Sequence, residues 1–372
     1  MKRVLIFSLA YYPNLVGGAE VAVKEITDRL GADFEFDMVT LQAGMQPFER
    51  IGTVQVYRIA GSKILYPWRA YRRALELHKQ KPYDLVWGMM AAYAGLAAML
   101  FKQKNKHVSF VLTLQEGDPI PYIKRRALPI YPWFKKIFTS ADVLQTISNY
   151  LADFGRSMGF KGTVEVIPNG VSYQKFANAQ AIDVGKKEGE IWLVHTGRLV
   201  KKNALDMVIK SLPLLPNNIH FLSIGAGPDK EMLESLAKKL SVFERVHFHP
   251  YVLIDELPQY VKACDIFIRP SRSEGMGNSF IEAFAAGLPV IATQVGGIAD
   301  FLFDAKRNPD KSTTGWAVEV DSPGQIAAQV KAILGNPEVT KEVIQNASKL
   351  AASRYDWDTI AGEMREKVFA RF

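Results

Sequence analysis

Two glutamates, Glu274 and Glu282, stand eight residues apart around a glycine-spaced loop. The apolar run at residues 266–268 is typical of a buried strand leading into this loop, and the residues after the loop predict a helix. Carboxylates accept hydrogen bonds from the hydroxyls of a sugar or ribose, whereas the amides of a glycine-rich helix start bind an anion. The contacts expected from this segment are Glu274, Gly275, Met276, Gly277, Asn278, Ser279 and Glu282. A segment with both kinds of contact suits a nucleotide sugar.

A second group of residues carries positive charge directly after another apolar run. Arg198 and Lys202 follow residues 192–194, which the pattern predicts to be a strand. A diphosphate requires positive charge, and arginine supplies a planar fork while lysine supplies a mobile point charge. Negative charge grows on a leaving diphosphate as its bond to the sugar breaks, so such cations stabilise the transition state more than the ground state. Because these side chains supply the charge, we expect no metal ion and no other cofactor.

The Glu-x7-Glu spacing, with the glycines between the two acids, resembles glycosyltransferase family 4, the retaining transferases of the GT-B architecture. The resemblance covers nearly the whole chain, from Tyr12 to Asp358. It implies that Glu274 binds hydroxyls of the donor sugar and that Glu282 holds the ribose. It implies further that the reaction retains the anomeric configuration without a protein nucleophile, because the leaving phosphate accepts the proton of the acceptor hydroxyl.

The resemblance assigns Arg198 and Lys202 to the leaving diphosphate. The chain departs from the family pattern here, because the commoner spacing places the lysine where Asn203 stands. Lys201 therefore stays open as an alternative to Lys202 for the phosphate contact.

A second departure lies at the end of the strand predicted at residues 111–114. Many family members carry a histidine at this place, facing the reacting sugar, whereas this chain has Gln115. Either Gln115 forms a hydrogen bond with the donor sugar, or Glu116 or Asp118 meets the acceptor hydroxyl. A mechanism without a protein nucleophile tolerates the loss of the histidine.

Two glycine-rich turns follow predicted strands. Gly18 lies in the turn between the first strand and the first helix, and Gly225 follows the strand at residues 221–224. In the resembled family the first turn lies against the donor diphosphate or the acceptor, and the second lies near the nucleoside. Both patterns also occur as plain turns that bind no ligand.

Apolar runs alternate with helix-like segments along the chain, which predicts parallel doubly wound sheets. At 372 residues the chain exceeds what one hydrophobic core usually supports, so we expect two domains. The polar stretch at residues 177–190 places the boundary at residue 180. The predicted fold class is α/β of the GT-B type, with two Rossmann-like domains, residues 1–180 and 181–356, facing each other across a cleft. The resemblance adds that a final helix at residues 357–372 packs back on the first domain.

Positive charge is concentrated in the first domain, where residues 61–136 contain 14 Lys and Arg but only 4 Asp and Glu. In residues 66–73 and 122–136 the cations alternate with aromatic residues. Cations interleaved with aromatic rings suit an anionic membrane surface, and a solvated face is the alternative. No recognition motif for nucleic acid accompanies the cations, so we expect no nucleic-acid partner.

These observations predict a retaining glycosyltransferase that moves a sugar from a UDP- or GDP-linked donor to a glycan or lipid-linked acceptor. Two alternatives stay open: a sugar-nucleotide 2-epimerase of the same architecture, and a non-catalytic protein that binds anionic surfaces. The single cysteine, Cys264, suits a reducing compartment. The apolar run at residues 87–101 is shorter than the roughly 20 residues that span a bilayer. We therefore expect a cytoplasmic enzyme that associates peripherally with the membrane.

Overall fold

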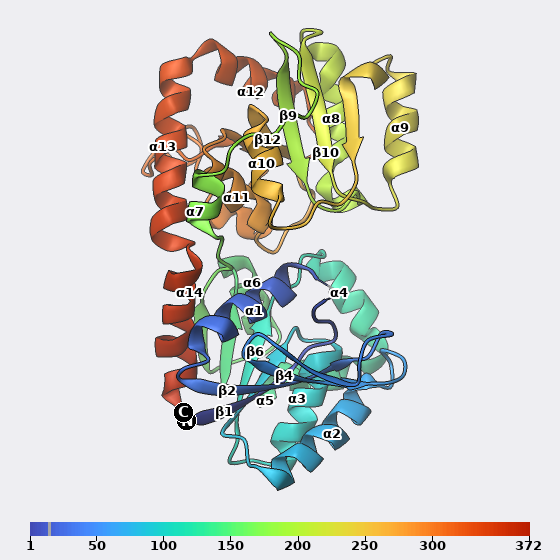
Figure 1. The fold of residues 1–372 in the computed structure, drawn as a ribbon, viewed down its shortest axis with the longest axis vertical. Helices are drawn as coiled ribbons and strands as arrows, with labels where there is room; N and C mark the ends of the chain where they lie inside the picture. The colour runs from blue at the N-terminus through green and yellow to red at the C-terminus, as the bar shows by residue number, and fades with distance from the viewer. Residues whose placement is uncertain (14–15) are drawn as a thin grey trace. The chain divides into compact units, whose positions relative to one another are not determined.

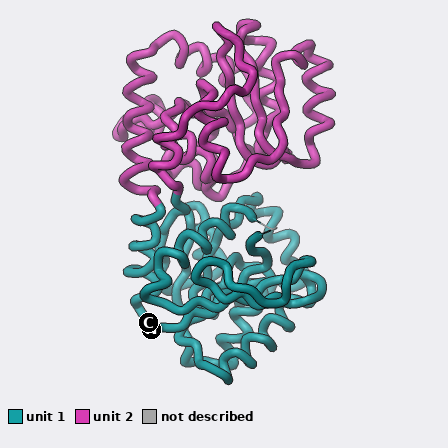
Figure 2. The backbone as a smooth tube through the Cα atoms, in the orientation of Figure 1, with its two compact units in different colours: residues 1–170, 357–372 teal, residues 171–356 magenta. Residues whose placement is uncertain are grey.

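The computed structural model describes residues 1–13 and 16–372, which form two compact units (Figure 2). Unit 1 comprises residues 1–170 and 357–372, and unit 2 comprises residues 171–356. The chain thus enters unit 2 before residue 180, where the polar composition had placed the boundary. The reason is local pairing, because the Val171 amide donates to the Tyr355 carbonyl at 2.7 Å and binds this residue to unit 2. Residues 178–190 form no helix or strand.

Unit 1 is built on a sheet with the strand order β3-β4-β2-β1-β5-β6-β7-β8 (Figure 1). Its strands are β1 (Lys2–Phe7), β2 (Phe34–Leu41), β3 (Phe48–Ile51), β4 (Val54–Ile59), β5 (Leu85–Met89), β6 (Ser109–Leu114), β7 (Val143–Thr146) and β8 (Thr163–Val166). Neighbouring strands are parallel except for β3 and β4, which form an antiparallel hairpin at one edge. The central strands are apolar and buried, as expected for parallel strands covered by helices on both faces.

The helices of unit 1 pack in pairs on this sheet. They are α1 (Gly18–Leu30), α2 (Tyr66–Gln80), α3 (Tyr93–Lys104), α4 (Ile120–Ala127), α5 (Tyr131–Ser140), α6 (Asn149–Ser157) and α14 (Trp357–Glu363). Helix α1 packs against α14, α2 against α3, and α3 against α5. The end of the chain completes this core, because the Phe369 ring contacts those of Phe34 and Trp87 with centroids 5.5 and 5.2 Å apart. Among the described residues, no helix is both long and apolar enough to cross a lipid bilayer.

Unit 2 repeats the scheme with a parallel sheet in the order β11-β10-β9-β12-β13-β14 (Figure 1). Its strands are β9 (Ile191–Thr196), β10 (Ile219–Ile224), β11 (Val246–His249), β12 (Ile266–Arg269), β13 (Val290–Ala292) and β14 (Trp316–Ala317). Its helices are α7 (Tyr173–Ala177), α8 (Leu205–Ser211), α9 (Lys230–Lys239), α10 (Leu257–Lys262), α11 (Asn278–Ala286), α12 (Pro323–Gly335) and α13 (Pro337–Arg354). The predicted fold class, two Rossmann-like α/β domains, is confirmed.

The strand order reverses direction between β1 and β5 in unit 1 and between β9 and β12 in unit 2. A doubly wound sheet opens a crevice at such a point, outside the carboxyl ends of the strands. In unit 2, β9 and β12 pair in parallel with Val194 opposite Phe267, so the loops after both strands leave the sheet at the same edge. The loop after β9 carries the predicted cations, and the loop after β12 carries Glu274 and leads into α11 with Glu282.

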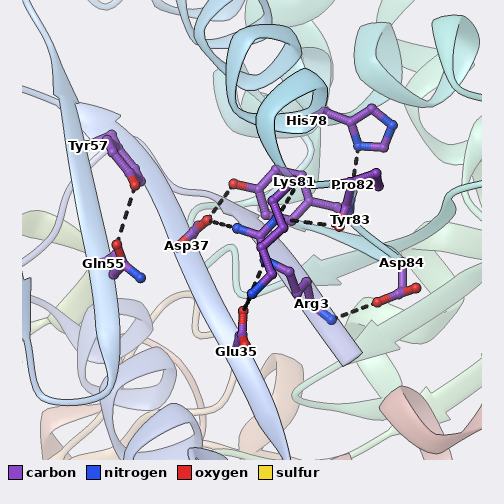
Figure 3. Close-up of polar contacts among 10 residues, drawn as sticks. All are labelled: Arg3, Glu35, Asp37, Gln55, Tyr57, His78, Lys81, Pro82, Tyr83 and Asp84. Carbon is purple, nitrogen blue, oxygen red and sulfur yellow. Dashed lines mark hydrogen bonds and ion pairs between the residues drawn. The ribbon is translucent and has the colours of Figure 1, made fainter. Parts of the chain in front are cut away.

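A group of charged residues lies at the other edge of the unit 1 sheet, near the amino ends of β1, β2 and β5 (Figure 3). We call Arg3, Glu35, Asp37, Lys81, Tyr83 and Asp84 the amino-edge cluster. Arg3 Nη2 lies 2.6 Å from Asp37 Oδ2, and the Tyr83 hydroxyl donates to the same oxygen at 2.5 Å. Arg3 Nε and Lys81 Nζ both approach Glu35 Oε2, at 3.1 and 2.5 Å. These contacts tie two strands and the loop before β5 together.

Candidate functional site

A buried arginine occupies the centre of the carboxyl edge of the unit 2 sheet. Arg269 ends β12, and its guanidinium donates to Glu274 Oε2 at 2.7 Å and to Ser279 Oγ at 2.9 Å. The same guanidinium lies 4.3 Å from the centroid of the Phe280 ring. Burial lowers the pKa of Arg269, and the carboxylates of Glu274 and Glu282 oppose this shift. Arg269 thus holds the loop that carries the first predicted acid.

The Glu274 carboxylate is approached by cations from two different loops. One oxygen bonds Arg269, and the other accepts the Gly275 amide at 3.0 Å and lies 3.6 Å from Lys202 Nζ. The Glu274 carbonyl accepts a hydrogen bond from the Gly297 amide at 3.2 Å. The structure therefore brings Glu274 and Lys202 together across the ends of β12 and β9.

The turn with the predicted cations is closed by Asn203. The 3₁₀ turn η2 (Lys201–Asn203) follows β9, and Asn203 Nδ2 donates to the Arg198 carbonyl at 2.7 Å. Asn203 is buried, so the position where the family more commonly has lysine serves here to close the turn. Lys202 rather than Lys201 approaches Glu274. The side chains of Arg198 and Lys201 are exposed and form no ion pair with any described residue.

Glu282 lies on α11 and is half-buried. Burial raises the pKa of Glu282 from 4.5 to about 7, and the neighbouring Arg269 acts in the opposite direction. Within residues 1–13 and 16–372, the carboxylate forms no hydrogen bond or ion pair. Its oxygens are thus available to the hydroxyls of a ligand. We call Arg198, Lys202, Arg269, Glu274 and Glu282 the carboxyl-edge cluster.

Two of the predicted glycines are required by close packing. Gly277 precedes α11 with φ of +89°, and a Cβ atom there would lie 2.4 Å from Arg269 Nη2. Gly225 has φ of +135°, and a Cβ atom there would lie 2.1 Å from the Gly197 carbonyl oxygen. A side chain at either position would therefore push the loops of the site apart.

Four further predicted contacts lie at the start of α11 or in the loop directly before it. Asn278 and Ser279 open this helix, and the Ser279 hydroxyl accepts the hydrogen bond from Arg269. The Met276 side chain is buried, and Gly275 donates its amide to Glu274. The loop before α11 is thus shaped by contacts within the site.

Two residues of this edge, Arg269 and His195, are absent from the sequence-based prediction. An arginine that directly follows a predicted strand and precedes Glu274 by five residues is the signal that points to Arg269. His195 lies buried in β9 with Nδ1 3.1 Å from Ser223 Oγ, and its Nε2 has no hydrogen-bond partner among the described residues. Burial, reinforced by the Arg269 charge, lowers the pKa of His195 well below its usual value, so the ring is neutral. Nothing in the sequence separates His195 from an ordinary core residue.

The remaining predicted residues, Gln115 and Gly18, belong to unit 1. Gln115 follows β6, and its Oε1 accepts a hydrogen bond from Asn169 Nδ2 at 3.1 Å. Gly18 begins α1, where the Glu20 carboxylate accepts the Gly17 amide at 2.8 Å and so caps the helix. Both residues follow strands of the unit 1 sheet on its carboxyl side, Gln115 in a loop and Gly18 at the first position of a helix.

Glu116 is a second acid at the same edge of unit 1. Its Oε1 accepts the Ala91 amide at 2.9 Å, and its buried Oε2 has no hydrogen-bond partner among the described residues. Burial raises the pKa of Glu116, and the amides of Ala91, Glu116 and Gln115 oppose the shift. The observed contact ties the loop after β6 to the residues after β5. Asp118 is exposed.

The carboxyl-edge cluster places the exposed Arg198 and the partly buried Lys202 at the same sheet edge as the Glu274 carboxylate, which Arg269 holds in place. Fixed cations stabilise charge that develops on a leaving phosphate, and carboxylates accept hydrogen bonds from hydroxyls. In the part of the chain that the structure describes, no three His, Cys, Asp or Glu side chains are arranged to hold a metal ion. The chemistry that this edge offers is recognition of an anionic, hydroxyl-rich ligand.

Comparison with known families agrees with this chemistry. Residues 16–175 match the family described as Glycosyltransferase Family 4, and residues 178–350 match Glycosyl transferases group 1. The two matches together cover most of both units, and the chain belongs to glycosyltransferase family 4. It is a glycosyltransferase of the GT-B type.

Individual relatives extend over nearly the whole chain. A GDP-mannose-dependent alpha-(1-6)-phosphatidylinositol monomannoside mannosyltransferase of Mycobacterium tuberculosis is 25% identical over 389 residues, which covers 98% of each chain. An uncharacterised glycosyltransferase of Methanocaldococcus jannaschii is 24% identical and covers 96% of this chain and 95% of its own. Among solved structures, Anabaena HepE in complex with UDP superposes with a TM-score of 0.80 at 16% identity, covering all of both chains. WaaG, a glycosyltransferase of lipopolysaccharide biosynthesis, has a TM-score of 0.74 at 19% identity and covers 98% of this chain and 99% of its own.

Proposed function

We propose that the protein is a retaining hexosyltransferase that uses a UDP- or GDP-sugar donor and a glycan or lipid-linked acceptor. The observation that supports this proposal most directly is the 3.6 Å distance between Lys202 Nζ and the Glu274 carboxylate. The exposed Arg198 belongs to the same loop as Lys202. A nucleotide sugar presents its diphosphate and its sugar hydroxyls next to each other. One cation beside one carboxylate matches these two neighbouring groups.

Four of the five residues of the carboxyl-edge cluster contact the substrate in this proposal. Arg198 and Lys202 neutralise the diphosphate as the bond between its oxygen and the anomeric carbon breaks. Glu274 accepts hydrogen bonds from the sugar, and Glu282 accepts them from the ribose. The acceptor oxygen bonds the anomeric carbon on the face that the phosphate leaves, and its proton passes to the leaving phosphate oxygen. Because the two cations carry the charge stabilisation, the proposal includes no metal ion.

The residues of unit 1 complete the proposal on the acceptor side. We assign Gln115 to a hydrogen bond with the donor sugar, in place of the histidine of many family members. Gly18 lies at the start of α1, where backbone amides face an anion favourably. The mycobacterial relative is named for a phosphatidylinositol monomannoside acceptor, which supports a lipid-linked glycan as the acceptor here.

A lipid-linked acceptor calls for contact with a membrane, and the surface of α4 and α5 suits one. Residues 119–141 contain five Lys and Arg and no Asp or Glu. None of these five cations forms an ion pair with a described residue. Leu128, Ile130 and Trp133 are 64%, 50% and 52% exposed between them. Exposed apolar side chains among unpaired cations favour the interface of an anionic bilayer.

Residues 66–73 carry a smaller share of the proposed membrane contact. Tyr66 is buried and donates its hydroxyl to the Val39 carbonyl at 2.7 Å, so this ring does not reach a membrane. Arg73 pairs with Glu76 at 3.0 Å, which reduces the charge that it offers to a lipid surface. We propose a peripheral enzyme on the cytoplasmic face that binds mainly through residues 122–136.

The donor is tested by offering a panel of UDP- and GDP-sugars to the purified protein and recording the unfolding midpoint. One nucleotide class should raise the midpoint, since a ligand at 100 times its Kd adds about 2.7 kcal/mol of stability. A donor incubated without acceptor should be recovered unchanged or slowly hydrolysed, whereas a 2-epimerase would convert it. With an acceptor, the product should keep the anomeric configuration of the donor, and a chelator should leave the rate unchanged. If no nucleotide shifts the midpoint, the proposal is rejected.

The membrane contact is tested by co-sedimentation with vesicles of phosphatidylcholine, with and without phosphatidylglycerol. The unmodified protein should sediment only with the anionic vesicles, and less at high salt. Trp133→Ser combined with Lys135→Gln and Lys136→Gln should reduce sedimentation about tenfold or more, at about 1 kcal/mol per cation. The matched control, Lys238→Gln with Lys239→Gln in α9, should change nothing. Equal sedimentation of all three proteins would contradict the proposal.

A further inference from the structure

Arg272 lies in the loop between β12 and α11 and bonds three other segments of unit 2. Its Nη1 donates to the Lys201 carbonyl at 2.6 Å, and its backbone amide donates to the Lys202 carbonyl at 2.7 Å. Its Nε donates to Asp321 Oδ1 at 2.6 Å, and its Nη2 donates to Asp206 Oδ2 at 2.9 Å. One residue thus joins the turn η2, the start of α8 and the turn after β14 to the loop of Glu274.

Arg272 contacts the turn η2 at main-chain atoms of its two lysines. Two successive carbonyls, those of Lys201 and Lys202, are fixed by the guanidinium and the amide of Arg272. A lysine side chain is long and flexible, so the place of its ammonium depends on how firmly its backbone is held. Glu274 follows Arg272 by two residues, so the same loop presents both the carboxylate and the clamp on Lys202.

The guanidinium of Arg272 is itself held in one orientation. Asp206 and Asp321 accept from two of its nitrogens, while the third nitrogen is directed at Lys201. The side chain is 21% exposed, so part of this network lies outside bulk water. The planar guanidinium donates to three fixed acceptors at once, namely Asp206, Asp321 and the Lys201 carbonyl. A lysine ammonium lacks this planar arrangement of donors and would not bond all three.

We propose that Arg272 is a positioning residue that sets the ammonium of Lys202 against Glu274 and thereby against the leaving diphosphate. The proposal rests on the function proposed above, because it acts through Lys202. Displacement of a reacting or charge-stabilising group by about 1 Å costs up to about 100-fold in rate. Loss of the clamp should therefore lower kcat while it leaves the donor KM nearly unchanged.

The test is a double-mutant cycle on kcat with the variants Arg272→Lys, Lys202→Gln and their combination. Arg272→Lys keeps a positive charge but loses the fork, and we expect about a tenfold loss of kcat in the unmodified protein. In the Lys202→Gln protein the same change should cost less than about twofold, because the group that it positions is gone. Arg307→Lys is the matched control, since Arg307 pairs only with the exposed Glu319 among the described residues, and should leave kcat unchanged.

The outcomes separate this inference from the proposed function. If Lys202→Gln alone leaves kcat unchanged, the proposed function fails. If Lys202→Gln lowers kcat but Arg272→Lys does not, or lowers it by the same factor in both backgrounds, the positioning role is overturned. Should Arg272→Lys not fold, Asp321→Asn removes one fixing contact at an exposed acceptor, and the same cycle is measured with it.

Discussion

The amino-edge cluster of unit 1 and the carboxyl-edge cluster of unit 2 both contain arginine, lysine and glutamate, but they serve different purposes. In the first, the charges of Arg3, Asp37 and Glu35 are matched at 2.6 to 3.1 Å, and a tyrosine hydroxyl adds to them. In the second, neither the Arg198 guanidinium nor the Glu282 carboxylate has an ion pair or side-chain hydrogen bond with any residue that the structure describes. Matched charges hold strands together, whereas unmatched ones remain available to a ligand.

The difference follows from the geometry of parallel sheets. Ligands of doubly wound sheets bind outside the carboxyl ends of the strands, so polar groups at the amino ends are free to satisfy each other. The two clusters should therefore respond in opposite ways to substitution. Changes at the amino edge should lower stability, and changes at the carboxyl edge should lower activity.

The largest effect is expected at the carboxyl edge. Arg198→Ala and Glu282→Ala should each lower kcat at least about 100-fold, because the first removes charge stabilisation of the leaving group and the second removes a substrate contact. Neither change should lower the unfolding midpoint by more than a few degrees, since neither side chain holds the fold together. Initial rates with saturating donor measure this, and Lys230→Ala on α9 serves as the control. Full activity in either variant would remove that residue from the site.

The second effect is expected at the amino edge and should appear in stability alone. Asp37→Ala leaves the partly buried Arg3 and the Tyr83 hydroxyl without their shared acceptor, which should cost about 3 kcal/mol and lower the unfolding midpoint by about 6–12 °C. Glu35→Gln, at the more exposed partner, should cost less than about 1 kcal/mol. The nucleotide-induced rise in the midpoint should be the same in both variants. A loss of nucleotide binding in Asp37→Ala would contradict the division of roles between the two clusters.

The central strands of both sheets were predictable because they are buried on both faces and read as continuous apolar runs. The hairpin of β3 and β4 was missed because it has no continuous apolar run; the alternation of its exposed and less exposed positions is the signal that would have revealed these edge strands. Position 180 looked like a boundary because the residues around it are polar. The backbone pairing of Val171 with the Tyr355 segment, which places the observed boundary, leaves no mark in composition.

The candidate acids could be identified in the sequence, whereas the arginines that brace the loops around them could not. Glu274 and Glu282 stand in a recognisable spacing, but Arg269 and Arg272 act through contacts between loops that only the fold creates. The choice between Lys201 and Lys202 likewise depends on the shape of the turn. Asn203 closes that turn on the Arg198 carbonyl, and in this turn Lys202 rather than Lys201 lies near Glu274.

The smallest expected effect is the dependence of stability and of nucleotide affinity on pH through Glu282. The pKa of Glu282 is raised to about 7 by burial, against 4.5 in the unfolded chain. Between these values the folded protein binds more protons than the unfolded chain, so Glu282 makes stability fall as pH rises from 4.5 to 7 and no further above it. The ionised carboxylate accepts hydrogen bonds from ribose hydroxyls more strongly than the neutral acid, so nucleotide affinity should rise by up to about tenfold from pH 6 to pH 8. Glu282→Gln should reduce the pH dependence of both stability and nucleotide affinity. Any pH dependence of affinity that remains in this variant comes from the phosphates of the nucleotide. Titration calorimetry at three pH values measures this, and an equal slope in both proteins would show that Glu282 does not contact the ligand.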